Sequence, residues 1–78
     1  MADEVLEFIA KALVDHPDDV EVTEVEEDGD ELVFELRVHP EDMGKVIGKR
    51  GRTAKALRTL VKAAGSLDDD NVTVEIVD

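Results

Sequence analysis

The first apolar residues of the chain recur at the spacing of an α-helix. Within residues 3–14 they share one side of a helix, because each residue turns the helix by about 100°. These residues are Val5, Leu6, Phe8, Ile9, Ala12 and Leu13. Pro17 would end such a helix, because proline lacks the amide proton that a helix interior uses. The pattern predicts an amphipathic helix whose apolar face, including Phe8, packs against the rest of the protein.

The next apolar residues alternate with polar ones, as in β-strands. Residues 20–27 carry valines among acids, but the alternation slips after Val22, which predicts an edge strand or a strand with a bulge. Asp28-Gly29-Asp30 is a tight-turn signal, and residues 31–38 alternate cleanly after it. These two strands are expected to form a hairpin with one buried face. Its apolar residues on the second strand are Leu32, Phe34, Leu36 and Val38.

Two helices are expected in the second half of the chain. Pro40 followed by two acids is typical of a helix start, and this short helix is expected to end at Gly48. The next helix is expected over residues 52–64, with Gly65 as its C-terminal stop. Its packing side is expected to carry Leu57, Leu60, Val61 and Ala64. Its opposite side carries Lys55, Arg58 and Lys62.

A last strand completes the predicted fold. Residues 68–71 form a polar turn, and Val72, Val74 and Ile76 alternate after it. The order is helix, strand, strand, helix, helix, strand, and the crossover through two helices is long enough to make the second and third strands parallel. The sequence therefore predicts a two-layer α+β fold, with three helices on one face of a three-stranded mixed sheet. At 78 residues the chain is expected to be one domain, residues 1–78, with a small core that self-association would supplement.

Charge is distributed unevenly along the chain. Lys and Arg number 9 against 21 Asp and Glu, which gives a net charge of −12. Seven of the basic residues fall between Met43 and Leu67, where no acid occurs, so the rest of the chain has two basic and 21 acidic residues and carries −19. Such a field disfavours general affinity for nucleic acid or anionic membranes, and any anion must be met locally. The acidity is interpreted as a device for solubility, with a saline host as the alternative.

The basic segment is centred on Gly48-Lys49-Arg50-Gly51. Glycines allow backbone angles closed to other residues and leave the main chain accessible to a ligand. Gly51, Arg52 and Thr53 are expected to open the following helix, so that their unpaired N–H groups and the positive end of the helix face the ligand. The cations around them are Lys45, Lys49, Arg50, Arg52 and Lys55. Together these features predict a site for phosphate groups.

The stretch Val46-Ile47-Gly48-Lys49-Arg50-Gly51 resembles the Val-Ile-Gly-x-x-Gly signature of KH domains. The order of elements is similar to the type II, prokaryotic arrangement, and residues 48–60 resemble those of the KhpA family of small single-KH bacterial proteins. The resemblance implies that residues 48–51 clamp the backbone of about four nucleotides of single-stranded RNA. It also implies that Val46, Ile47 and Ala54 line an apolar groove under the bases. Many KH domains carry a larger aliphatic residue than Ala54, which implies a shallower groove here.

The expected function is a non-enzymatic RNA-binding module in the cytoplasm, since the chain opens without a basic leader or a long apolar run. The resemblance further implies a homodimer and pairing with a larger KH-containing, KhpB-like partner. Two alternatives stay open: a protein-interaction adaptor that uses its helices for dimer formation, and a helix-hairpin-helix DNA-binding protein. A nucleotide-binding loop is excluded, because the stretch from Gly44 to Arg50 is one residue short and has Arg50 where Ser or Thr should bind magnesium.

Other residues with reactive or ligating side chains are interpreted as structural, and no metal or cofactor is expected. Cysteine is absent, which rules out disulfides and thiolate metal sites. His16 and His39 are far apart in the sequence, with neither a nucleophile nor a ligand cluster near them. Residues 68–70, three aspartates, lack the spacing of a calcium loop. Phe8 and Phe34 are both expected on apolar faces, so no exposed aromatic platform for stacked bases is predicted.

Overall fold

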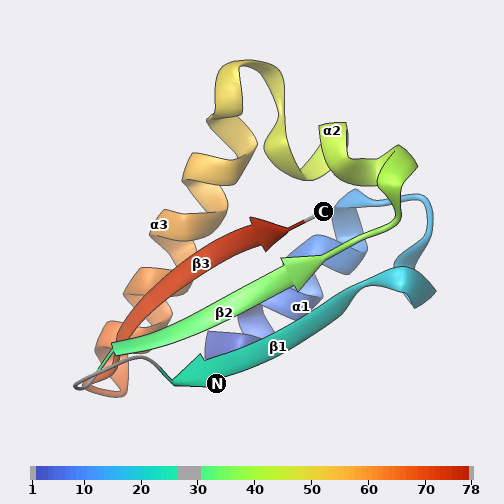
Figure 1. Ribbon diagram of the computed structural model, residues 1–78. Helices are drawn as coiled ribbons and strands as arrows, with labels where there is room; N and C mark the ends of the chain where they lie inside the picture. Colours follow the sequence, from blue (N-terminus) through green and yellow to red (C-terminus); the bar gives the residue numbers. More distant parts are fainter. Residues whose placement is uncertain (1, 27–30, 78) are drawn as a thin grey trace.

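The computed structural model describes residues 2–26 and 31–77. Its helices and strands are α1 (Ala2–Leu13), β1 (Glu21–Glu26), β2 (Glu31–Arg37), α2 (Met43–Ile47), α3 (Arg52–Leu67) and β3 (Asn71–Val77). Single-turn 3₁₀ helices lie at Pro17–Asp19, Pro40–Asp42 and Lys49–Gly51. Figure 1 shows the resulting path, and the predicted order of helix, strand, strand, helix, helix, strand is confirmed. No helix in this part of the chain is long and apolar enough to cross a membrane.

The three strands form one mixed sheet in the order β1-β2-β3. β1 pairs antiparallel with β2 in a continuous register, from Glu21 opposite Arg37 to Glu26 opposite Leu32. The first strand is therefore an edge strand whose register has no bulge over residues 21–26. β2 and β3 are parallel, which confirms the predicted crossover. The turn predicted at residues 28–30 lies outside the described residues.

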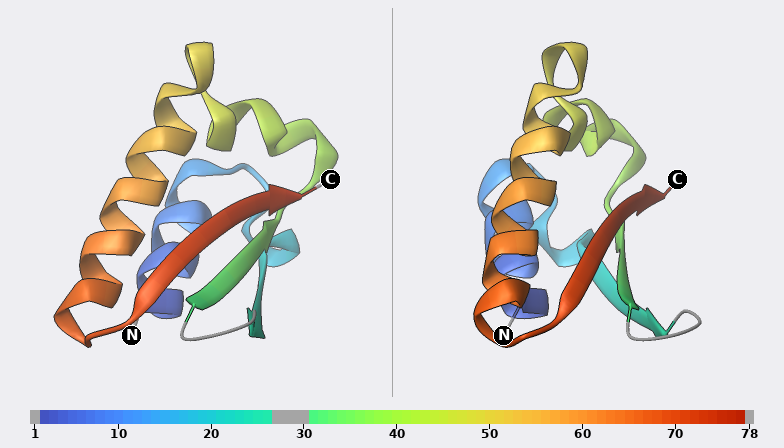
Figure 2. Two further views of the ribbon diagram at one scale, coloured as in Figure 1. Left: turned by 60° about the vertical axis from the view of Figure 1, so that its left-hand side comes forward. Right: turned by 90° about the vertical axis from the view of Figure 1, so that its left-hand side faces the viewer.

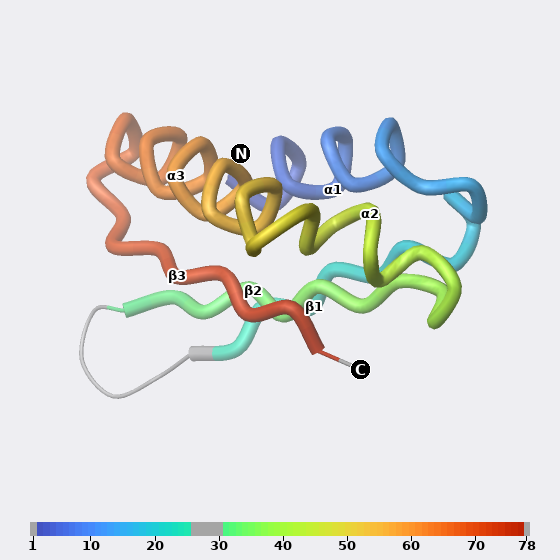
Figure 3. Tube along the Cα trace, turned by 90° about the horizontal axis from the view of Figure 1, so that it is seen from above, coloured from blue at the N-terminus to red at the C-terminus, as the bar shows by residue number. Residues whose placement is uncertain are grey.

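All three helices lie on one face of the sheet, which confirms the two-layer α+β architecture; Figures 2 and 3 show the two layers from the side and from above. The core fills the space between the layers and includes Leu6 of α1, Val46 of α2 and Leu57 of α3, all at most 2% exposed. The strand residues predicted to face the helices all belong to this core or pack against it. They are Leu32, Phe34, Leu36, Val38, Val72, Val74 and Ile76.

The apolar face of α1 is narrower than the sequence predicts. Its buried residues are Ala2, Leu6 and Ala10, spaced by four along the helix. Phe8 lies off this line and is 76% exposed. The expectation that both phenylalanines are packed is therefore wrong for Phe8, whereas Phe34 is buried.

The C-terminal part of α3 also differs from the prediction. Gly65 does not stop the helix, which continues to Leu67. Gly65 is buried, and a Cβ atom there would lie 2.5 Å from Cγ2 of Val72, so the glycine permits a close approach between α3 and β3. Leu60, predicted on the packing side, is 52% exposed. The buried line of α3 instead runs through Ala54, Leu57, Val61 and Gly65.

Candidate nucleic-acid interface

Residues 48–51, the GxxG loop, join α2 to α3 at one end of the molecule, the top of Figure 1. Three of the four residues have a positive φ: Gly48 at 76°, Arg50 at 58° and Gly51 at 74°. Gly48 combines this φ with a ψ of 174°, a region that is almost restricted to glycine. Arg50 and Gly51 have the left-handed helical conformation, which glycine tolerates best.

The two glycines differ in the space around them. A Cβ atom on Gly48 would overlap the hydroxyl and Cβ of Thr53 and would lie 2.9 Å from the Thr53 backbone nitrogen. Gly51 has nothing within 4 Å of the corresponding point. Gly48 therefore serves both backbone geometry and contact with the first turn of α3, whereas Gly51 serves backbone geometry alone.

The backbone amides of the loop divide into used and unused donors. The N–H of Gly51 donates to the carbonyl of Gly48 at 3.2 Å, and the N–H of Arg52 donates to the carbonyl of Lys49. These two donors, predicted to be unpaired, are thus occupied. Within residues 2–26 and 31–77, the N–H groups of Lys49 and Arg50 have no intramolecular acceptor. Lys49 has helical angles and Arg50 left-handed ones, a combination that forms an anion-binding concavity.

The basic side chains around the loop fall into two groups. Lys49, Arg50, Arg52 and Lys55 are exposed, and no acidic residue of the described chain pairs with them. Lys45 is different, because its Nζ lies 3.0 Å from an oxygen of Asp15. This hydrogen bond to Asp15 raises the pKa of Lys45. Four of the five predicted cations are therefore free for an external anion, and the fifth is already engaged.

The other two cations of α3 lie further along the helix. Nε of Arg58 donates to the backbone carbonyl of Val74 at 3.3 Å. Arg58, which the sequence places on the side of the helix opposite its packing side, thus contacts β3. Lys62 borders a polar depression together with Ser66 and residues 69–71 at the other end of α3.

The predicted apolar groove is smaller than expected. Val46 is fully buried in the core and Ala54 is 4% exposed, so neither presents a surface to a base. Ile47 alone of the three reaches the surface, at 39% exposed. Val46 and Ala54 instead hold α2 and α3 against the core on either side of the GxxG loop.

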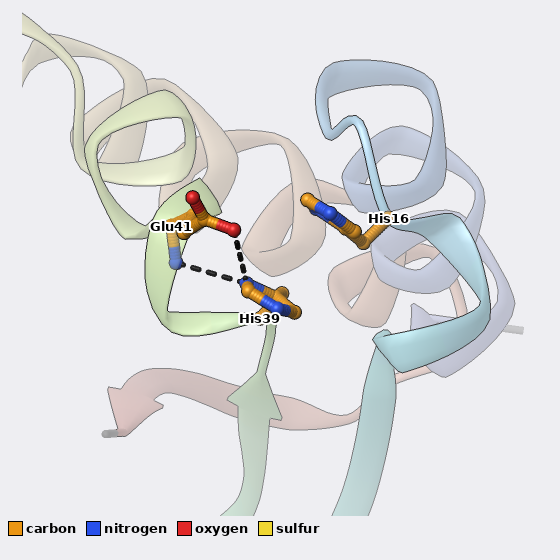
Figure 4. Close-up of side chains that lie close together, drawn as sticks. All are labelled: His16, His39 and Glu41. Carbon is orange, nitrogen blue, oxygen red and sulfur yellow. Dashed lines mark hydrogen bonds and ion pairs between the residues drawn. The ribbon is translucent and has the colours of Figure 1, made fainter.

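A second cluster, which the sequence interpretation missed, lies beneath α2. The rings of His16 and His39 stack with their centroids 4.0 Å apart, and an oxygen of Glu41 lies 3.8 Å from Nδ1 of His39 (Figure 4). The expectation that no ligand cluster lies near either histidine is wrong, because these three residues place one ligand atom each within 4.8 Å of one another. The only signal in the sequence is that each histidine precedes a proline that begins a 3₁₀ helix.

Asp42 ties this cluster to α2. It is the one buried charged side chain among the described residues, at 1% exposed. Its Oδ2 accepts hydrogen bonds from the backbone N–H of His16 at 2.9 Å and from Nδ1 of His16 at 3.0 Å. Burial alone would raise the pKa of Asp42, but these bonds and one from the Asp15 backbone outweigh it and lower the pKa. The same contact with Asp42 raises the pKa of His16.

Comparison with known families decides where this fold and loop belong. The family described as KhpA/KhpB, KH domain, has a model that matches residues 3–76. The chain belongs to this family. The GxxG loop described above lies within the residues that match the family.

Several KhpA proteins are similar to the chain over nearly its full length. The RNA-binding protein KhpA of Halalkalibacterium halodurans is 60% identical over 73 residues, which are 94% of this chain and 95% of that protein. The protein of the same name from Clostridium perfringens is 59% identical over 75 residues, 95% of this chain and 97% of that protein. That from Listeria monocytogenes is 51% identical over 76 residues, 97% and 99% of the two chains.

Solved structures of Era share the fold of this KhpA/KhpB-family chain. Era of Aquifex aeolicus bound to GDP and aluminium fluoride matches with a TM-score of 0.67 at 24% identity, over 96% of this chain and 29% of Era. Era in complex with MgGDPNP and a segment of 16S ribosomal RNA matches with a TM-score of 0.65 at 23% identity, over 96% of this chain and 28% of Era. At these identities the likeness establishes the fold, and the chain corresponds to less than a third of either Era chain.

Proposed function

We propose that this KhpA/KhpB-family KH domain binds single-stranded RNA at its GxxG loop and catalyses no reaction. The observation that carries the proposal is the pair of adjacent, unpartnered amides of Lys49 and Arg50, in a loop flanked by unpaired cations. Amides and cations of this kind bind phosphate groups. The names of the KhpA relatives favour RNA as the source of the phosphates.

The same contacts set the expected selectivity. Phosphate contacts position a nucleic acid but do not read its sequence. Ile47 is the one exposed apolar residue of the predicted groove, so few base contacts are available. Binding is therefore expected to be weakly sequence-specific and to span about four nucleotides, as in other KH domains.

The experiment is reversal of charge at the tip of the loop, Lys49→Asp with Arg50→Asp. Aspartate tolerates the left-handed conformation of residue 50, so the loop should keep its shape. Each charge-assisted hydrogen bond to phosphate contributes about 1.5–3 kcal/mol, so the double variant should lose at least about tenfold in affinity. Fluorescence anisotropy with a labelled single-stranded oligoribonucleotide measures the loss, and circular dichroism checks the fold.

A matched control separates the loop from the general field of the molecule. Lys11→Asp with Lys62→Asp changes the net charge by the same amount at exposed positions on α1 and at the far end of α3. The control should weaken binding much less than the loop variant. Equal losses of affinity in the two variants would mean that RNA responds only to the overall charge of the protein and not to the loop. A folded loop variant with unchanged affinity would contradict binding at the GxxG loop and would favour the alternative of a protein-interaction adaptor.

Exposed apolar side chains favour an additional role in assembly. Phe8, Leu60 and Leu67 are 76%, 52% and 89% exposed on α1 and α3, two helices that contact each other (Figure 2). We propose that these residues contribute to a homodimer, which the small core also favours. Pairing with a KhpB-like protein is proposed on the family resemblance.

Light scattering after size exclusion tests the homodimer. The wild-type protein should have twice the chain mass at micromolar concentration, and Phe8→Ser with Leu60→Ser should have the mass of one chain. Lys62→Ser, at an exposed position on the other side of α3, should leave the mass unchanged. A single-chain mass of the wild type at every concentration would remove the homodimer while leaving RNA binding intact.

Two broader predictions belong to the same proposal. We regard residues 1–78 as one KH domain, and the match of the family over residues 3–76 supports this view. Placement in the cytoplasm stays a prediction, which imaging of the protein in its host would test.

A further inference from the structure

We propose that His16, His39 and Glu41 bind a divalent transition-metal ion of the Zn²⁺ type. One ligand atom from each residue lies within 4.8 Å of the others. Figure 4 shows their arrangement, with His16 on the segment after α1 and the other two after β2. Two imidazoles and one carboxylate are a donor set that suits Zn²⁺ and its neighbours, with a fourth position left for water. The proposal is independent of RNA binding by the GxxG loop.

His39 faces two groups with conflicting requirements. Its Nδ1 accepts a hydrogen bond from the backbone N–H of Glu41 at 3.0 Å, so that nitrogen carries a lone pair. The same Nδ1 lies 3.8 Å from Oε1 of Glu41, which also carries lone pairs. A proton on Nδ1 would suit the carboxylate but abolish the bond from the amide. A metal ion between the nitrogen and the oxygen would bind the lone pairs of both atoms. Its binding would break only the exposed hydrogen bond from the backbone N–H of Glu41 to His39.

His16 is prepared for ligation by its other nitrogen. Its Nδ1 lies 3.0 Å from Oδ2 of Asp42, so Nδ1 is the donor and Nε2 keeps the lone pair in the neutral ring. A buried carboxylate behind a histidine fixes the tautomer and the ring orientation of many metal ligands. Oδ1 of Asp42 is buried without a hydrogen-bond partner in the described chain. The carboxylate therefore has negative charge to spare, which a cation beyond His16 would offset.

One ring must leave the stack before both can bind the same ion, because an imidazole lone pair lies in the plane of its ring and the two rings are nearly parallel, with an interplanar angle of 14°. Tetrahedral zinc with bonds of about 2.0–2.2 Å holds its ligand atoms about 3.4 Å apart. The present spread of up to 4.8 Å must therefore shrink by about an ångström or more. The side chains of Glu41 and His39 are 76% and 29% exposed, so these two can turn toward the ion while Asp42 holds the ring of His16 in place. Such an open site should bind more weakly than a closed four-ligand zinc site.

Proton NMR of the untagged protein tests the site directly. The chain has two histidines and no cysteine, so the imidazole C–H signals report only His16 and His39. Zn²⁺ added over a background of excess Mg²⁺, which occupies the acidic surface, should shift both signals together and saturate at one equivalent. Glu41→Gln should weaken the binding by at least about tenfold, and Asp42→Asn by about 10–100-fold through the orientation of His16.

Exposed carboxylates outside the proposed site could also bind Zn²⁺ weakly, so the control removes two of them. Asp69→Asn with Asp70→Asn removes two exposed carboxylates from the turn after α3 and should leave the Zn²⁺ affinity unchanged. The proposal is overturned if the imidazole signals do not move in a large excess of Zn²⁺, or if only one histidine responds. It is also overturned if Glu41→Gln binds as tightly as the control. Glu41 is exposed, so its variant should fold even if Asp42→Asn does not.

Discussion

The two glycines of the GxxG loop are required for different physical reasons. Gly48 has backbone angles that other residues almost never adopt, and Thr53 occupies the space where a side chain would begin. Gly51 has left-handed helical angles in open space. Position 48 of the motif therefore has no space for any side chain, whereas position 51 has space for one but a backbone conformation that disfavours it.

Alanine substitutions should separate these two requirements. Gly51→Ala should cost about 1–2 kcal/mol of the free energy of unfolding, from left-handed strain alone. Gly48→Ala should cost about 2–6 kcal/mol, because strain and overlap with Thr53 contribute about 1–3 kcal/mol each. Urea denaturation measures both, and Gly51→Asn, which suits the left-handed region, is the control. Equal losses at positions 48 and 51 would contradict the geometry of the loop.

The contact between His16 and Asp42 should make stability depend on pH in the metal-free protein. Asp42 raises the pKa of His16 above 6.5 in the folded protein. The contribution of protonated His16 to stability is therefore fully present below pH 6.5 and is lost as pH rises through the pKa of the folded state. The pKa of Asp42 is held below 3.8, so its contribution is present above pH 3.8 and is lost as pH falls through the folded value. The contact should therefore contribute most between these two pH values.

Urea midpoints from pH 3 to pH 8, with a chelator present, check this dependence. The other acidic groups also titrate in this range, so the informative quantity is the difference between the wild type and His16→Gln. That difference should shrink above neutral pH. A difference that stays constant from pH 5 to pH 8 would show that His16 does not gain stability by protonation.

At the scale of elements, local pattern was enough to predict the strands and their pairing. Alternation has a period of two, so each apolar residue of β2 or β3 is assigned to a face by its neighbours alone. The buried faces of the helices were predicted less accurately, because α1 and α3 carry apolar residues over a wide arc of the helix surface and the sheet covers only part of that arc. Phe8 and Leu60 lie outside that part, and no local signal marks its edge.

Gly65 shows the same limit in another form. A glycine near the end of a helix commonly ends it, but here it marks the place where β3 returns against α3. That contact depends on Val72, which follows a turn and belongs to another layer of the fold. Only the three-dimensional arrangement distinguishes the two uses of glycine.

Replacement of Gly65 by alanine is expected to destabilise the protein. Helix propensity alone favours alanine by about 1 kcal/mol. The added Cβ would lie 2.5 Å from Cγ2 of Val72 and 3.4 Å from the carbonyl oxygen of Asp70, and such overpacking costs about 1–3 kcal/mol. The net effect should be a loss in the free energy of unfolding, measured in urea.

A second substitution tests the cause of that loss. Val72→Ala removes the methyl groups that the new Cβ would meet, so Gly65→Ala should be much less costly, or favourable, in that background. A gain in stability from Gly65→Ala in the wild type would show that the glycine is a helix end and not a packing device.

At the scale of the whole molecule, the positive loop stands at one end of a strongly negative protein. The candidate loop could be predicted because its glycines and cations are consecutive in the sequence. The pairing of Lys45 with Asp15 and the meeting of His16 with His39 could not, because each joins segments that only the fold brings together. The sequence thus predicted the loop but not which of its neighbours are free.

Salt should act on folding and on RNA binding in opposite directions. The chain has a net charge of −12, and ions screen its self-repulsion with a Debye length of about 8 Å at physiological strength, so stability should rise with potassium chloride. RNA held by about four phosphate contacts should lose affinity with a log-log slope near −3, about −0.7 for each contact. Thermal melts and binding titrations over one salt series measure both. Affinity that stays flat while stability rises would show that the loop cations do not contact RNA.

The hydrogen bond from Arg58 to Val74 has a consequence for behaviour at high concentration. β3 is an edge strand, and an edge carbonyl that points away from the sheet can accept a strand from another molecule. Arg58 occupies that carbonyl with a charged side chain, and β1 at the opposite edge carries glutamates along its length. One acceptor of the β3 edge is thus unavailable for pairing with a strand of another molecule, and the glutamates of β1 disfavour such pairing at the other edge, so loss of Arg58 should make the β3 edge more prone to aggregation.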